Sequence, residues 1–182
     1  INVDNVFIGV NNVNGNFNNA PNATINIGQN DGNISFNGIV NSSSPAVFTN
    51  SGTIIIDNTS KEGIENQAEF NNAANATINI GQNGGNIGSD GIFNFGSSAF
   101  FTNNGNITAD NTSSSGVRNE GATFDNSVNA TINIGQNDGN IGGIGLSNAE
   151  GAATFTNNGN INIDNTSGTG ISKQATYKNP AT

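Results

Sequence analysis

The chain of 182 residues contains no cysteine, histidine, methionine or tryptophan. Without histidine and cysteine, it cannot build a zinc site from those ligands. A redox dithiol and a histidine-dependent catalytic triad are excluded for the same reason. These absences remove several common classes of metalloprotein, oxidoreductase and hydrolase.

Positive charge is also scarce in this sequence. Four basic residues stand against thirteen acidic residues, which gives a formal net charge of -9 at pH 7. Four cations cannot neutralise a phosphate backbone, so nucleic acid is not an expected partner. No apolar run approaches the length of a membrane span, so no transmembrane segment is expected.

Leucine occurs once, at Leu146, whereas isoleucine occurs 22 times and asparagine 41 times. Helices favour leucine, alanine, glutamate and lysine, while isoleucine, phenylalanine and threonine favour pleated strands. Isoleucine, valine, leucine and phenylalanine together contribute 42 residues, just above the range typical of disordered chains. The composition therefore predicts an all-β protein and excludes an α-helical one.

An internal repeat covers the whole chain. Three long units share the phrase Asn-Ala-Thr-Ile-Asn-Ile-Gly-Gln-Asn at spacings of 53 and 54 residues. Each long unit is followed by a shorter unit that contains Asp-Asn-Thr-Ser, so units of about 31 and 22 residues alternate, as is typical of a solenoid. The long and short units begin alternately at Phe17, Phe48, Phe70, Phe101, Phe124 and Phe155.

Every unit follows one template. It opens with an aromatic residue, asparagine follows two positions later, and an alternating stretch such as Ile25-Asn26-Ile27 comes next. Long units add the insert Gly-Gln-Asn-x-Gly-Asn-Ile, which brings an extra apolar position at Ile34, Ile87 and Ile141. A structural aromatic column is predicted at Phe17, Phe48, Phe70, Phe101, Phe124, Phe155 and Tyr177. A structural asparagine ladder is predicted at Asn19, Asn50, Asn72, Asn103, Asn126, Asn157 and Asn179.

This template predicts a parallel β-helix. Alternation with period two places Ile25 and Ile27 on one face of a strand and Asn26 on the other. If each unit is one coil, equivalent residues stack about 4.8 Å apart. Because crossovers between parallel strands wind right-handed, we predict one uncapped right-handed β-solenoid of about seven coils. The predicted coils are 1–16 (partial), 17–47, 48–69, 70–100, 101–123, 124–154, 155–176 and 177–182 (partial).

The ladder asparagines have two interpretations. Structurally, each amide can bond the amides of the neighbouring coils. Functionally, a row of exposed amides could grip a sugar or a flat surface. The structural interpretation is preferred, because a ligand site rarely needs the same residue in all seven coils.

The acidic residues of the short units alternate with glycine in the long units. Asp57, Asp110 and Asp164 occupy the position that Gly28 and Gly81 hold in long units, which keeps like charges about two strand spacings apart. An Asx-turn at each corner explains these aspartates. Calcium bridging between coils is the alternative, although the glycine-rich signature of calcium-binding β-rolls does not repeat. No cofactor and no metal-binding residue is therefore predicted.

Signals of catalysis are weak. A polysaccharide lyase or hydrolase on this fold needs clustered carboxylates, usually with arginine or lysine on adjacent coils. Arg118 is the only arginine, and no acidic pair recurs beside it. We therefore predict no catalytic residue and no enzymatic activity.

The two ends of the segment complement each other. The residues from Tyr177 to Thr182, followed by those from Ile1 to Asn16, make a 22-residue coil that matches the short unit beginning at Phe155. One explanation is a longer polypeptide that repeats this block in tandem, and the other is separate chains stacked head to tail. In both cases the expected partners are further copies of the same solenoid, and the tandem polypeptide is preferred.

The phrases Phe-x-Asn-x-Gly-x-Ile-x-Ile and Gly-Ile-x-Asn resemble the Asn- and Gly-rich repeats of very large bacterial surface adhesins. Those repeats are of the filamentous-haemagglutinin type, and secreted giant proteins of Bacteroidota have similar ones. The resemblance covers the whole chain, although alternating 31- and 22-residue coils depart from the more uniform coils of that type. It implies an extracellular stalk or fibre at the cell surface, exported by a signal outside this segment.

We therefore expect a non-catalytic shaft of an extracellular filament or giant cell-surface adhesin that supports cell attachment. The alternative is a β-solenoid module in which one face binds carbohydrate or another surface. A Thr-x-Thr ladder in every coil would favour ice binding, but Thr24, Thr77 and Thr131 stand before isoleucine in long units only.

Overall fold

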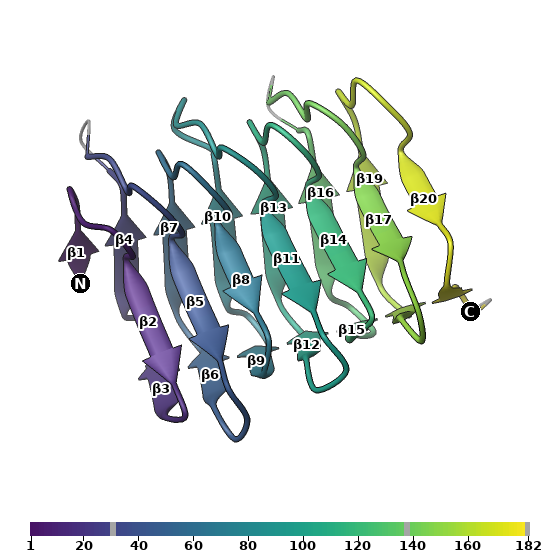
Figure 1. Cartoon of the computed structure of the whole chain (residues 1–182), viewed down its shortest axis with the longest axis horizontal. Coiled ribbons are helices and arrows are strands. Elements are labelled where there is room, and N and C mark those ends of the chain that lie inside the picture. Colours follow the sequence, from purple (N-terminus) through teal and green to yellow (C-terminus); the bar gives the residue numbers. More distant parts are fainter. Residues whose placement is uncertain (30–31, 137–138, 181–182) are drawn as a thin grey trace.

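The computed structural model describes residues 1–29, 32–136 and 139–180, which form a parallel β-solenoid. These residues include no helix, and hence no apolar helix long enough to cross a membrane. In Figure 1 the front strands run downward and the strands behind run upward while the chain advances from the N- to the C-terminus, which is a right-handed winding. The predicted fold class is confirmed.

Three parallel sheets of seven strands form the sides of the solenoid, and the chain visits them in turn. Sheet A contains β1 (Asn2–Val3), β4 (Thr24–Ile27), β7 (Thr53–Ile56), β10 (Thr77–Ile80), β13 (Asn106–Ala109), β16 (Thr131–Ile134) and β19 (Asn160–Ile163). Sheet B, in front in Figure 1, contains β2 (Val10–Val13), β5 (Ile39–Ser42), β8 (Ile64–Asn66), β11 (Ile92–Phe95), β14 (Val117–Glu120), β17 (Leu146–Ala149) and β20 (Ile171–Lys173). Sheet C contains β3 (Asn16–Asn19), β6 (Val47–Asn50), β9 (Glu69–Asn72), β12 (Phe100–Asn103), β15 (Thr123–Asn126), β18 (Thr154–Asn157) and β21 (Thr176–Lys178).

Equivalent residues of the repeat stand side by side in neighbouring coils. Phe48 pairs with Phe17 on one side and with Phe70 on the other. Because each template position meets its own copy in the next coil, every position becomes a column along the solenoid axis. Residues 181–182 of the last partial coil lie outside the described residues.

The interior is filled by isoleucine and phenylalanine. In β10, Ile78 and Ile80 are buried while Thr77 and Asn79 face outward and are half-buried. A fully buried side chain of this size contributes about 1.5–3 kcal/mol by leaving water. One coil alone cannot bury these side chains, so the stability of the fold comes from stacking between coils.

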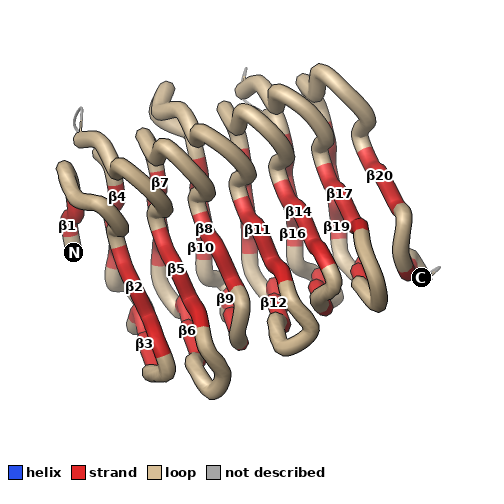
Figure 2. Tube along the Cα trace, viewed as in Figure 1, coloured by secondary structure: helices blue, strands red, loops and turns tan. Residues whose placement is uncertain are grey.

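The extra residues of the long coils are distributed differently from the single insert that the sequence suggests. The corner from sheet A to sheet B comprises residues 28–38 in a long coil and 57–63 in a short coil. The other two corners are also longer, with residues 43–46 against 67–68 and 20–23 against 51–52. Figure 2 shows larger and smaller loops alternating along the upper edge. The insert stands out in the sequence because its residues repeat closely, whereas the extra residues at the other corners vary.

Two expectations about column membership are wrong. Ile34 is a buried apolar residue as expected, but its position is not an extra one, because Ile34 forms a β-bridge with Thr59 of the short coil, which in turn bridges to Ile87. Threonine is β-branched and fits the same site, but a purely hydrophobic pattern overlooks it. Similarly, the threonine column of sheet A is not limited to long coils, because Thr53 pairs with Thr24.

Candidate functional site

The seven aromatic residues of the template form one continuous stack inside the solenoid. From Phe17 to Phe155, neighbouring ring centroids lie 4.6 to 4.8 Å apart, with interplanar angles of 16° or less. The last step, to Tyr177, is 5.6 Å. Burial raises the pKa of the Tyr177 phenol. Aromatic pairs of this kind contribute roughly 0.5–1.5 kcal/mol of stability in addition to the effect of the area that they bury. The stack therefore stabilises the contact between each coil and the next.

The asparagines two positions after these aromatic residues form a hydrogen-bonded ladder. In every step, the side-chain Nδ2 donates to Oδ1 of the asparagine in the next coil at 2.7 to 2.9 Å. Asn72, for example, is fully buried and also donates to the backbone carbonyl of Asn106. From Asn19 to Asn157 these amides bond to one another, and most also donate to the backbone, so they serve the fold, whereas Asn179 at the end of the ladder is exposed. The ladder runs through Asn19, Asn50, Asn72, Asn103, Asn126, Asn157 and Asn179.

A second asparagine ladder, missing from the predicted site residues, runs along sheet B. Its five steps each measure 2.8 Å from Nδ2 to Oδ1. The signal in the sequence is the Gly-aliphatic-x-Asn phrase, whose asparagine lies two positions after the aliphatic residue. In the described coils the ladder ends at Asn148, because the residue in register with it in the next coil is Lys173. The members are Asn12, Asn41, Asn66, Asn94, Asn119 and Asn148.

Long and short coils interlock at the corner from sheet A to sheet B. Gly28 has a φ of +67°, and a Cβ added there would lie 1.9 Å from the carbonyl oxygen of Asp57. Oδ2 of Asp57 accepts hydrogen bonds from Gln29 of the preceding coil at 2.7 Å and from Asn83 of the following coil at 3.1 Å. The glycine of each long coil thus lies between the aspartates of two short coils, and side-chain amides donate hydrogen bonds to the aspartate carboxylates. The glutamine contact recurs between Gln82 and Asp110 and between Gln136 and Asp164.

The described ranges contain no group of three or more acidic side chains that could hold a metal ion. Positions 30–31 and 137–138 of two inserts lie outside those ranges. Calcium bridging therefore gains no supporting ligand set from this corner.

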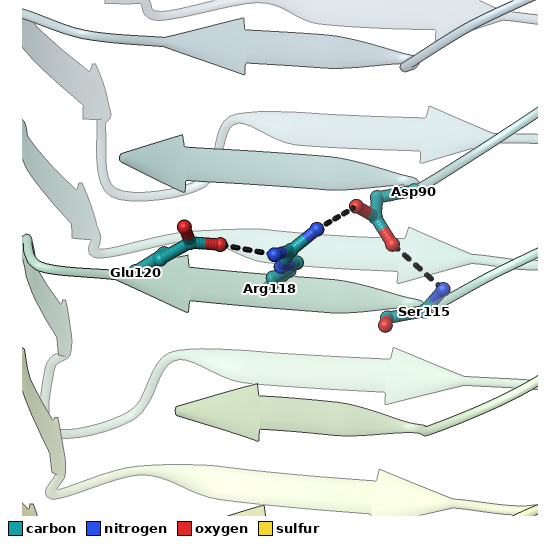
Figure 3. A network of polar contacts seen from close by, with 4 residues as sticks. All are labelled: Asp90, Ser115, Arg118 and Glu120. Carbon is teal, nitrogen blue, oxygen red and sulfur yellow. Dashed lines mark hydrogen bonds and ion pairs between the residues drawn. The ribbon is translucent and has the colours of Figure 1, made fainter. Parts of the chain in front are cut away.

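Sheet B carries a charged cluster on its outer face that is absent from the predicted site residues. The guanidinium of Arg118 lies 3.9 Å from Oδ2 of Asp90 in the preceding coil and forms an ion pair with Glu120 on its own strand (Figure 3). The other oxygen of Asp90 accepts the backbone N–H of Ser115 at 2.8 Å. The ring of Phe93 lies beneath the guanidinium, 4.8 Å from its Cζ atom.

An acidic pair thus flanks Arg118, although the sequence shows none beside it. Asp90 precedes Arg118 by 28 residues, and only the register between β11 and β14 brings the two together. The arrangement suits an ion network better than catalysis, because Asp90 is 1% exposed and both carboxylates share one guanidinium.

The pKa of the Glu120 carboxyl lies above its ordinary value. Burial raises its pKa, the positive charge of Arg118 lowers it, and the nearby carboxylate of Glu150 raises it. The net direction is upward, so burial and Glu150 together outweigh the ion pair. This carboxyl therefore holds its proton to a higher pH than an isolated glutamate.

Comparison with known proteins finds no matching family model, no similar curated protein and no similar solved structure.

Proposed function

We propose that this chain is a non-catalytic structural segment of the shaft of an extracellular filament or giant cell-surface adhesin. The observation that carries the proposal is the continuity of the interior columns. The aromatic stack includes all seven strands of sheet C without a gap, and the ladder runs through the first six strands to Asn179, directly after β21. A column that repeats the same contact in each coil can be lengthened by adding coils, and this is the property a shaft needs.

The contacts between coils also favour a stiff rod. Neighbouring coils are joined by three parallel strand pairs, two buried asparagine bonds and one aromatic contact, as between the coils that contain Asn41 and Asn66. These contacts lie on three sides of the cross-section, so bending toward any side must open one of them. A rod held on all sides can keep a contact domain at a distance from a surface.

The extracellular location and the role in attachment are inferred from the sequence. The resemblance to adhesin repeats supports both, and a cysteine-free chain with a net charge of -9 is compatible with a soluble shaft outside the cell. Further copies of the solenoid are the proposed partners. The last strand, β21, belongs to sheet C, and the first, β1, belongs to sheet A, which follows sheet C in each coil.

Direct fusion of two copies of residues 1–182 tests the shaft proposal. If the joined residues close a 22-residue coil, the product is one straight rod of roughly 68 Å, twice the roughly 34 Å of seven strand spacings. Electron microscopy and small-angle X-ray scattering measure that length. A control fusion with a short Gly-Ser linker at the junction should bend freely. If the direct fusion bends as freely as the control, the proposal is wrong.

A further inference from the structure

The corner from sheet C to sheet A carries ridges and grooves with a period of two coils. In long coils this corner has four residues, as at 73–76, and in short coils it has two, as at 51–52. The long corners form ridges, and a groove lies over each short corner between two ridges. One groove of about 550 Å³ lies between the ridges of Asn22 and Asn75, and another of about 560 Å³ lies between those of Asn75 and Asn129.

Glycine keeps the floor of each groove low. A Cβ added to Gly52 would lie 2.2 Å from the carbonyl oxygen of Ala23, and one added to Gly105 would lie 2.3 Å from that of Ala76. The two floors therefore pack directly on the backbone of the preceding coil. The grooves are built alike, with Pro21 and Ala74 at equivalent places on successive ridges.

The asparagines that line these grooves differ from those of the ladders. Within the part of the chain that the structure describes, the side-chain amides of Asn22, Asn75 and Asn129 form no hydrogen bond. All three are exposed and have a positive φ of 65° to 68°. Their amides are free donors and acceptors at the groove walls, where alanine, proline and valine supply apolar surface.

Among the residues that the structure describes, no charged side chain lines either groove, although the chain has a net charge of -9. An anionic ligand would approach against the field of the whole molecule. Amide donors and acceptors beside small apolar groups instead match the hydroxyl groups and C–H faces of a neutral sugar.

The spacing of the grooves favours a linear glycan. Their centres are two coils apart, roughly 9.6 Å at the usual strand spacing. In a β-(1→4)-linked glycan, successive sugars face opposite ways, so the same face returns once per disaccharide. A chain of this kind lying along the solenoid axis would offer an equivalent sugar to each groove.

We propose that this row of grooves binds a neutral β-(1→4)-linked glycan parallel to the solenoid axis. A single shallow groove holds a sugar weakly, but two grooves that engage one chain reinforce each other. The inference adds a binding activity to the shaft, and it stands whether or not copies of the solenoid join end to end.

Titration of cellohexaose into the isotope-labelled chain tests this proposal by NMR. The side-chain amide of Asn75 and the backbone amide of Gly105 should shift, and cellobiose should bind about 10-fold more weakly than the hexasaccharide. An oligomannuronate of equal length, which is β-(1→4)-linked, should not bind at low salt, because it is anionic. No shift with cellohexaose, or equal binding of the anionic probe, overturns the proposal.

Matched variants locate the site. Asn75→Gly removes the amide shared by both grooves and suits the positive φ, so it should weaken cellohexaose binding about 10-fold. Asn129→Gly affects one groove and should cause a smaller loss. Asn14→Gly is the control, since Asn14 is also exposed with a positive φ of 56° but lies on another corner. If Asn14→Gly weakens binding as much as Asn75→Gly, the sugar does not bind in these grooves.

Discussion

The two faces of the strands in sheet C differ in how far the same residue type recurs from coil to coil. Along the inner face of sheet C, an aromatic residue and an asparagine recur in every coil. Along the outer face, the position before the aromatic residue holds valine in β6, glutamate in β9 and phenylalanine in β12. Inner residues touch their own copies above and below, so one change disturbs two neighbours. On the outer face of sheet C one side of each residue faces the solvent, and its identity varies from coil to coil.

Phe101 and Phe100 make the sharpest test of this comparison, because they are neighbours on β12. Phe101 is fully buried in the aromatic stack, whereas Phe100 is 39% exposed on the outer face. Phe101→Ala should lower the free energy of unfolding by about 3–5 kcal/mol through lost burial and a cavity. Phe100→Ala should cost under about 1 kcal/mol. Urea unfolding followed by circular dichroism measures both, and equal losses would refute the distinction between the two faces.

Asn72 and Asn71 extend the test to one polar residue type on β9. Asn72 accepts from Asn50 at 2.9 Å and donates to Asn103 at 2.8 Å, while Asn71 donates to exposed Glu69. Asn72→Ala should cost about 2–4 kcal/mol, because it leaves buried partners with fewer hydrogen bonds. Asn71→Ala should change stability by less than about 0.5 kcal/mol. A loss below 1 kcal/mol for Asn72→Ala would mean that the ladder follows the fold and does not stabilise it.

The inner face is the part of the fold that the sequence predicts well. Phe48 and Phe70 reveal their column because contact between copies demands the same residue each time. The ladder of Asn41 and Asn66 belongs to the same repeat. It is harder to predict, because the aliphatic residue of the Gly-aliphatic-x-Asn phrase is the more obvious core position. The equivalence of Ile34 and Thr59 is hidden because a buried column accepts both side chains.

The outer features resist prediction for a related reason. The pairing of Asp90 with Arg118 depends on a register in which two residues 28 apart in sequence meet across coils. Neither residue recurs at equivalent positions, so no repeat pattern marks them. The grooves arise from two extra residues at alternate corners, and only the arrangement of three successive coils shows that Asn75 lines both. Sequence periodicity therefore reveals what coils share, while these outer-surface features depend on how neighbouring coils differ.

The smallest expected effect is a change in the pKa of Glu120. It tests whether the outer face tolerates substitution even where charged side chains cluster. Glu150→Gln removes a neighbouring negative charge, so the pKa of Glu120 should fall, although burial still holds it above its ordinary value. Because this pKa is raised in the folded chain, the carboxyl contributes stability at pH values below its unfolded pKa, and that contribution is lost as the pH rises through the folded pKa. In Glu150→Gln, less stability should therefore be lost as the pH rises. The difference should be small, since the cluster is partly exposed. NMR titration of the Glu120 carboxyl carbon, with Glu62→Gln as control, measures the shift. An unchanged or higher pKa in Glu150→Gln would show that Glu150 does not act on Glu120, and that burial and Arg118 set the pKa of this carboxyl.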